Sequence, residues 1–245
     1  MNLHNFLLAL ITVSLLCGCK SSKLTLVDQE GYSKVEAFYL DLSRNNKSVT
    51  LYPDASLQQI VLLRHGEPDL DKNSRRSYKQ MKQFIYDYDT VRVKPIEQVP
   101  LIIDPSKVDL IHSSALMRAY NTSEQLYGHE IEISADSLFR EFEREVVAFP
   151  ILKLRPKTWG VWSRIFWVMG FKSNSIESFR QAKSRAKEIA EFLAEDANEN
   201  QYSVLVSHGF LMRYVKKELI KNEWQLSYDG GNGYLGALIL TKIER

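Results

Sequence analysis

Two short apolar runs, each leading to a histidine and a glycine, constrain this chain more than any other feature. The first run covers residues 60–63 and leads to His65, and the second covers residues 204–206 and leads to His208. Apolar runs of this length between polar residues are typical of buried strands. A strand that ends in a glycine turn holds its last side chains at the carboxyl edge of a sheet, where open α/β folds bind ligands. The pattern predicts an α/β fold with a polar site at that edge.

The remaining periodicity predicts strands that alternate with helices. Further strands are expected over residues 108–112, 131–133 and 235–240, and helices over 33–42, 74–88, 115–127, 174–197 and 211–220. The long helix would begin with Asn174 and Glu177 as a capping box. Alternation of this kind indicates a mostly parallel sheet with helices on both faces. We therefore expect a three-layer α/β/α sandwich.

A cap segment is expected as an insertion over residues 146–172. Three of the four tryptophans, Trp159, Trp162 and Trp167, lie within it. We expect them first to pack in a small hydrophobic core; a lid over the pocket and a membrane-facing patch are the alternatives, in that order. Specificity for the substrate is expected to come from this segment and from the loop at 229–234.

The amino terminus has the character of an export signal. Residues 6–16 are an apolar core too short to span a bilayer. Residues 16–20, with Gly18 before Cys19, resemble a bacterial lipobox, so residues 1–18 are predicted to be a lipoprotein-type signal peptide with Cys19 lipidated. A plain secretory signal and an uncleaved anchor are the alternatives. Residues 19–55 would be a tether and a peripheral element, and residues 56–245 the main domain.

This interpretation predicts a lipid-anchored protein of the bacterial cell envelope, facing the periplasm from the outer membrane if two membranes are present. Both cysteines of the chain, Cys17 and Cys19, fall in this region, so disulfides and cysteine catalysis are excluded from the domain. The net charge of +2 gives no reason to expect nucleic acid as a partner. The sequence does not predict an oligomeric state.

The residue types at the strand ends suit a phosphate ester. Guanidinium groups such as those of Arg64 and Arg118 bind phosphoryl oxygens bidentately and stay charged. A neutral imidazole can attack phosphorus, and a second histidine can contact the phosphoryl oxygens as charge develops. A carboxylic acid can protonate the leaving alkoxide and then activate water. The cluster of Glu141, Glu143 and Glu145 offers candidates for this acid.

The order and spacing of four motifs resemble the histidine phosphatase superfamily, the phosphoglycerate-mutase-like enzymes, in its phosphatase branch. The motifs cover residues 63–67, 113–122, 139–141 and 206–209. The resemblance implies a metal-independent phosphomonoester hydrolase that acts on a small phosphorylated substrate without a cofactor. It implies these roles: His65 as the phosphorylated nucleophile, Arg64, Arg118 and His208 as the phosphate pocket, Glu141 as the proton donor, and Asn73 as a further polar pocket residue.

Several alternatives stay open. In many family members glycines follow the donor glutamate, but no glycine follows Glu141 here. Glu143 is therefore a rival proton donor. A phosphoglycerate mutase-type phosphotransferase and a non-catalytic phospho-ligand binding protein are alternative functions on the same fold. A zinc site of His65, His112 and His208 can also be drawn. The arginine beside His65 argues against a cation there, and we expect His112 to make a structural hydrogen bond instead.

Overall fold

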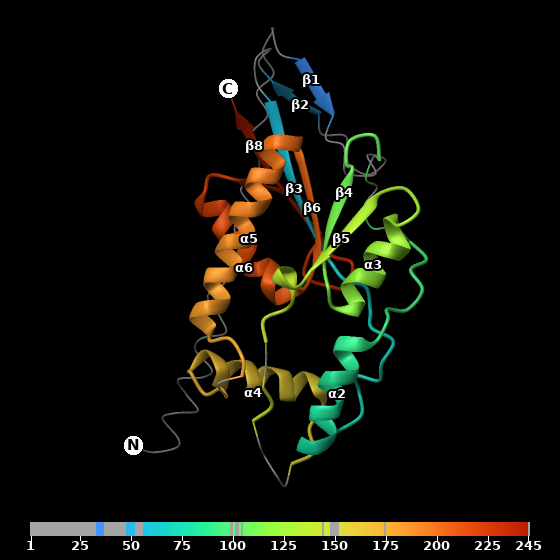
Figure 1. Cartoon of the computed structure of the whole chain (residues 1–245), viewed down its shortest axis with the longest axis vertical. Helices are drawn as coiled ribbons and strands as arrows, with labels where there is room; N and C mark the ends of the chain where they lie inside the picture. Colours follow the sequence, from blue (N-terminus) through green and yellow to red (C-terminus); the bar gives the residue numbers. More distant parts are fainter. Residues whose placement is uncertain are drawn as a thin grey trace.

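A six-stranded sheet forms the centre of the described chain (Figure 1). The computed structural model describes residues 33–36, 48–51, 56–98, 100, 103, 105–143, 145–147, 152–173 and 175–244. Neighbouring strands follow the order β5-β4-β6-β3-β8-β7. The strands are β3 (Ser56–Arg64), β4 (Leu110–Ser114), β5 (Glu132–Asp136), β6 (Tyr202–Ser207), β7 (Gln225–Asp229) and β8 (Ala237–Glu244).

The sheet is mostly parallel, as the sequence predicts. Strands β5, β4, β6 and β3 run in one direction, and β8 runs antiparallel to both β3 and β7. In the pairing of β3 with β6, Arg64 lies opposite Ser207. The residues that follow these two strands therefore emerge side by side at one edge of the sheet.

Helices cover both faces of this sheet, which confirms the three-layer α/β/α architecture (Figure 1). Ile60 and Leu62 of β3 point toward one face and pack with residues of two helices, whereas Val61 and Leu63 point toward the other. This alternation follows from the two-residue period of a strand. The helices are α2 (Tyr78–Thr90), α3 (Met117–Tyr127), α4 (Pro156–Val168), α5 (Phe179–Asn200) and α6 (Gly209–Lys221). Helices α5 and α6 lie on the first face and α3 on the second.

The expected cap segment is built around α4, which packs with α2 beyond the carboxyl ends of the parallel strands (Figure 1). Trp159 is fully buried with Met81 and Phe84 of α2, and its indole N–H donates to the carbonyl of Arg76 at 2.9 Å. Only Trp159 packs in a small core as expected: Trp167 is buried in the main core against Phe142 and Phe179, and Trp162 is 38% exposed. The cap therefore has its own small core and one outward-facing tryptophan.

Three expected helices differ in the structure, and one of them, α2, begins at Tyr78 instead of residue 74. The helix predicted over 33–42 is wrong for the residues that are described there, because β1 (Ser33–Glu36) pairs antiparallel with β2 (Ser48–Leu51). Helical spacing of three apolar residues is a local signal and does not reveal a distant strand partner. Residues 37–42 lie outside the described residues. The long helix α5 begins later than expected, since Ser178 is its N-cap and forms the capping box with Gln181; Asn174 lies outside the described residues.

Helix α4 and strand β7, like β2, were not predicted from the sequence. Helix α4 carries large apolar residues on its exposed side as well as on its buried side, which hides its amphipathic period in the sequence. Strand β7 is an edge strand of mostly polar residues, held by pairing with β8. None of the helices in the described ranges is both long and apolar enough to cross a bilayer. The predicted signal peptide and Cys19 lie outside those ranges.

Candidate active site

The two predicted strand-end histidines lie together. The parallel pairing of β3 with β6 puts His65 next to His208, and their ring centroids are 5.1 Å apart. The backbone N–H of His65 donates to the carbonyl of Ser207 at 2.9 Å. Both side chains are buried, with 2% and 0% of their surfaces exposed. The pairing of β3 with β6 thus places two buried imidazole rings next to each other.

Hydrogen bonds determine the tautomer of His65. Its Nδ1 lies 2.7 Å from the carbonyl oxygen of Gly66. A carbonyl can only accept, so Nδ1 carries the hydrogen and the lone pair is on Nε2. The turn that supplies this carbonyl is itself held by Thr122 of α3, whose hydroxyl oxygen accepts from the Gly66 N–H at 2.9 Å and donates to the carbonyl of Arg118 at 2.6 Å.

The second histidine is oriented by β4. Nε2 of His208 lies 2.8 Å from the hydroxyl oxygen of Ser114, the last residue of β4. That hydroxyl also accepts from the backbone N–H of Leu116 at 3.3 Å. His208 is in addition the N-cap residue of α6, so its ring lies at the amino terminus of a helix. The partial positive charge of a helix amino terminus favours anions nearby.

Arg64, which is half-buried, lies beside these histidines. Its guanidinium carbon is 4.5 Å from the ring centroid of Tyr234, and one of its terminal nitrogens donates to the carbonyl of Asn232. Its buried Nε has no hydrogen-bond partner among the described residues. Gly209 permits this placement, because a Cβ there would lie 3.2 Å from both Cδ and Nε of Arg64. An arginine with an unused buried donor is suited to bind an anion.

Arg118 is held in place by contacts with the end of α2. It is 1% exposed, and its Nη1 donates to the carbonyl of Tyr88 at 3.0 Å and to the carboxylate of Asp89 at 2.8 Å. None of its hydrogen bonds among the described residues joins it to Arg64 or the two histidines, and its buried Nε has no partner there. The structure therefore connects Arg118 to the end of α2 and leaves one of its donors unused.

The two candidate carboxylates lie in different surroundings. Glu141 accepts hydrogen bonds from the backbone N–H groups of Leu211 at 3.0 Å and Phe210 at 3.3 Å, in the first turn of α6. Glu143 instead accepts from the backbone N–H of Glu177 at 2.6 Å and lies 3.4 Å from a terminal nitrogen of Arg140. Glu141 is thus within one helical turn of His208, whereas Glu143 belongs to the junction with α5.

The remaining predicted residues lie elsewhere. Asn73 is exposed in a turn, where its backbone N–H donates to Asp71 at 2.8 Å, and no contact joins its side chain to the histidines among the described residues. His112 makes the structural hydrogen bond that the sequence predicts, with Nε2 lying 3.0 Å from a carboxylate oxygen of Asp196. Within the described ranges, no group of three or more His, Cys, Asp or Glu side chains is arranged to hold a metal ion.

Tyr234 contacts the site, and the sequence predicted it only as part of the loop at 229–234. Its ring lies 5.6 Å from that of His65, and the Nζ of Lys72 is 4.5 Å from its centroid. The only local signal for Tyr234 is its place after a glycine-rich stretch.

Lys72 and Lys94 both pair with Glu67, and these hydrogen bonds hold the pKa of the Glu67 carboxyl below its usual range.

Comparison with models of protein families shows which family this chain belongs to. The model of the histidine phosphatase superfamily, branch 1, matches residues 60–234, which include the four motifs at 63–67, 113–122, 139–141 and 206–209. This chain belongs to the histidine phosphatase superfamily. Membership makes it an enzyme of the phosphatase type. A comparison with curated protein sequences gives no significant match.

Solved structures that resemble this histidine phosphatase are distant in sequence. One is a phosphoserine phosphatase variant from Entamoeba histolytica in complex with phosphoserine: 18% identity, 76% of this chain and 95% of that chain covered, TM-score 0.46. Another is a mycobacterial glucosyl-3-phosphoglycerate phosphatase: 19% identity, 76% and 97% covered, TM-score 0.47. A third, from Mycobacterium tuberculosis, has 15% identity, with 77% and 96% covered and a TM-score of 0.43.

Proposed function

We propose that this chain hydrolyses phosphomonoesters through a phosphohistidine intermediate on His65, without a metal or organic cofactor. The observation that carries the proposal is the 2.7 Å hydrogen bond between Nδ1 of His65 and the Gly66 carbonyl. It puts the lone pair on Nε2, which is the atom that would attack phosphorus. His208, Arg64 and the amino terminus of α6 surround this histidine with groups that favour an anion.

The reaction would take place in two steps. In the first, Nε2 of His65 forms a bond to phosphorus, the ester P–O bond breaks, and the leaving alkoxide takes the proton of Glu141. In the second, Glu141 accepts a proton from water, the water oxygen bonds to phosphorus, and the P–N bond breaks. Inorganic phosphate leaves and His65 regains its lone pair. One carboxyl therefore acts as acid and then as base.

The phosphate pocket would use the buried Nε groups of two arginines. The Nε groups of Arg64 and Arg118 are buried donors without partners among the described residues. A buried donor without a partner costs free energy, and three negatively charged phosphoryl oxygens would satisfy both donors. His208 would contact a further oxygen, oriented by its hydrogen bond to Ser114. The contacts of Arg118 with Tyr88 and Asp89 would hold the rest of its guanidinium in place.

Glu141 is our proposed donor in preference to Glu143. Its carboxylate lies against the first turn of the helix that His208 caps, so it is next to the phosphate pocket. Glu143 is engaged with the backbone of Glu177, and its own carbonyl accepts from Arg164 at 2.7 Å. These contacts favour a structural role for Glu143 in joining the cap to α5.

The first test is hydrolysis of p-nitrophenyl phosphate by the full chain in detergent, with and without a chelator. We expect chelator-resistant turnover and an acid-labile phosphoenzyme when the ester carries labelled phosphate. His65→Ala should abolish both, while the control His129→Ala, at an exposed turn residue, should keep both. Turnover that the chelator abolishes would contradict the mechanism. Phosphate binding without any turnover would instead favour the phospho-ligand binding protein. A panel of small phosphorylated metabolites would then narrow the substrate.

We also propose that the chain is a lipoprotein of the cell envelope, anchored through Cys19. The support is the apolar stretch at residues 6–16 followed by the lipobox-like residues 16–20. Several acyl chains on one cysteine anchor a protein firmly, whereas a single chain binds only marginally. Labelling with palmitate in a bacterial host should mark the wild-type chain and not Cys19→Ser. Labelling of both chains would contradict the assignment.

A further inference from the structure

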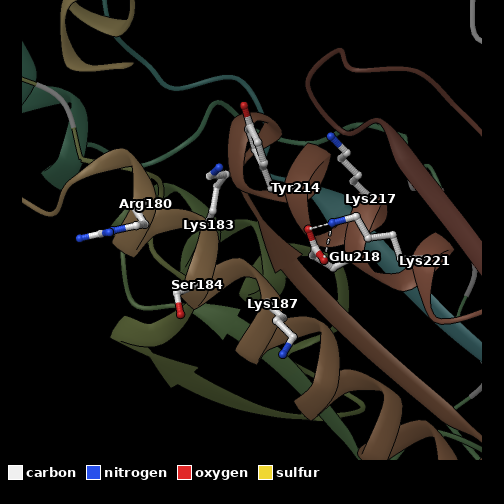
Figure 2. A pocket seen from close by; sticks show the side chains of 8 residues that line it. All are labelled: Arg180, Lys183, Ser184, Lys187, Tyr214, Lys217, Glu218 and Lys221. Atoms are coloured by element: carbon white, nitrogen blue, oxygen red, sulfur yellow. Dashed lines mark hydrogen bonds and ion pairs between the residues drawn. The ribbon is translucent and has the colours of Figure 1, made fainter. Parts of the chain in front are cut away.

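A shallow groove lies between α5 and α6, on the side of these helices away from the sheet (Figure 2). Its volume is about 390 Å³. Five cationic side chains and one carboxylate contribute to its lining: Arg180, Lys183, Lys187, Lys217, Lys221 and Glu218. The whole chain has a net charge of only +2, so this groove concentrates positive charge that the rest of the surface balances.

Three of these cations have no carboxylate partner among the described residues. Lys221 pairs with Glu218 at 2.7 Å, and Lys187 pairs with Glu191 at 3.1 Å. Arg180, Lys183 and Lys217 form no ion pair with a carboxylate within the part of the chain that the structure describes. Figure 2 shows them extending from the two helices around the groove. Like charges held together repel, and an anionic partner offsets that repulsion.

Helix α4 adds an exposed apolar surface. Its inner side is buried through Trp159 and Trp167. Large apolar side chains on the outer side and in the turn that follows are exposed: Val161, Trp162, Val168, Met169 and Phe171. Phe171 has 62% of its surface exposed. A cluster of large apolar groups in contact with water marks an interaction surface more often than a chance arrangement does.

Helix α4, which carries the apolar surface, contacts α5, which carries part of the groove. The ring of Trp167 packs on Phe179, the first residue of α5, with centroids 5.3 Å apart. Phe179 in turn contacts Tyr214 at 5.7 Å, and the Nζ of Lys183 lies 5.0 Å from its ring centroid. Tyr214 and Lys183 both line the groove. Phe179 therefore connects α4 directly to the basic groove.

We propose that the exposed side of α4 and the α5–α6 groove form one surface that docks on an anionic membrane. Lysine and arginine side chains attract anionic lipid headgroups, and tryptophan and phenylalanine side chains favour the boundary between headgroups and acyl chains. The two chemistries are carried here by helices that pack on each other. A small soluble anion would use the groove alone and would not account for the apolar surface. Lipid on Cys19 is not needed for this docking.

Trp162 is a built-in reporter of this contact. The chain has four tryptophans, and the other three, Trp159, Trp167 and Trp224, are at most 3% exposed. The full chain is reconstituted with vesicles of phosphatidylcholine, with or without phosphatidylglycerol, in which some acyl chains carry bromine. We expect bromine to quench tryptophan fluorescence on the anionic vesicles and not on the neutral ones. Trp162→Phe should remove the quenched component. Attachment through the amino terminus alone would leave Trp162 unquenched.

The groove is tested by neutralising two of its lysines. A lysine near an anionic surface strengthens binding roughly fivefold. Lys183→Gln with Lys217→Gln should therefore weaken docking about 25-fold, read as loss of quenching on titration with phosphatidylglycerol. Lys79→Gln with Lys82→Gln on α2 removes the same charge from another exposed surface and should leave quenching unchanged. Circular dichroism checks that each variant is folded.

Three results would overturn the proposal. One is equal quenching on neutral and anionic vesicles, and another is wild-type quenching in the groove variant. The third comes from acetylation of lysines in the full chain: inorganic phosphate alone would protect Lys183 and Lys217 as well as anionic vesicles do. That result would identify a site for small anions in place of a membrane surface.

Discussion

The carboxylate of Glu141 accepts a 3.0 Å hydrogen bond from the backbone N–H of Leu211. This contact joins the segment after β5 to the first turn of α6, directly after His208. The neighbouring Glu143 makes its contacts with the start of α5 instead. The structure thus separates two carboxylates that lie two positions apart in the chain and have similar local sequence around them.

Glutamine should therefore lower turnover at position 141 and stability at position 143. Glu141→Gln keeps an acceptor oxygen for Leu211 but cannot supply the proton, so kcat should fall about 100- to 10,000-fold with the fold intact. Glu143→Gln should keep kcat within a factor of about two while lowering the free energy of unfolding by about 1 kcal/mol, because its bond to Glu177 loses charge. Steady-state hydrolysis of p-nitrophenyl phosphate and urea unfolding measure both quantities. Loss of turnover in Glu143→Gln alone would reverse the assignment.

Gly209 should control the phosphate affinity through Arg64. In Gly209→Ala the added Cβ would lie 3.2 Å from Cδ and Nε of Arg64, so the guanidinium must move. We expect KM and the inhibition constant for inorganic phosphate to rise about tenfold, equivalent to half or more of one charged hydrogen bond. Gly160→Ala is the matched control, since its added Cβ meets nothing within 4 Å and should stabilise α4 by up to about 1 kcal/mol. An unchanged phosphate affinity in Gly209→Ala would show that Arg64 does not bind the phosphate.

Trp159 and Trp162 should differ in their importance for stability. Trp159→Phe removes a hydrogen bond to Arg76 and part of a fully buried ring, which should lower the free energy of unfolding by about 2 kcal/mol. Trp162→Phe changes an exposed residue and should alter it by less than about 0.5 kcal/mol. Urea unfolding followed by circular dichroism measures both. Equal losses would mean that the cap does not depend on the small core between α2 and α4.

The pair of His112 and Asp196 should make stability depend on pH. Burial raises the pKa of Asp196, but hydrogen bonds from His112 and Asn200 outweigh it, so the pKa in the folded state lies below the ordinary 3.8. A lowered carboxyl pKa stabilises the fold above the unfolded-state value, and this contribution is lost as the pH falls through the folded-state value. The destabilisation caused by Asp196→Asn should thus be largest near neutral pH and shrink below about pH 4. A difference that does not vary between pH 7 and pH 3 would contradict this.

Much of the fold follows from local patterns. The apolar runs before His65 and His208 predict two buried strands, and both end where their glycine turns indicate. Strands that alternate with helices predict the parallel sheet and its two covered faces, because a parallel connection has to cross over one face. The candidate nucleophile, its histidine neighbour and Arg64 were predicted from the same residues. Their catalytic roles stay predictions until the variants above are measured.

Other features depend on contacts between segments distant in the chain. Strand β7 has few apolar residues and exists through its pairing with β8, and β1 pairs with β2 where a helix was expected. The outward side of α4 is apolar in sequence like its buried side, so only the packing of α4 against α2 and against the main core shows which tryptophans are enclosed. Arg118 was expected in the phosphate pocket, and its contacts with Tyr88 and Asp89 became visible only with α2 in place.

The sequence by itself determined the strand ends, the types of reactive side chain on them and the family, since these depend on short runs of residues. The tertiary structure alone decided which glutamate reaches α6, where Tyr234 meets Arg64 and where lysines of α5 and α6 gather around one groove. The physical reason is that hydrogen bonds, ring contacts and charge repulsion act over a few ångströms in space. No local pattern in the chain shows which distant residues come within that range.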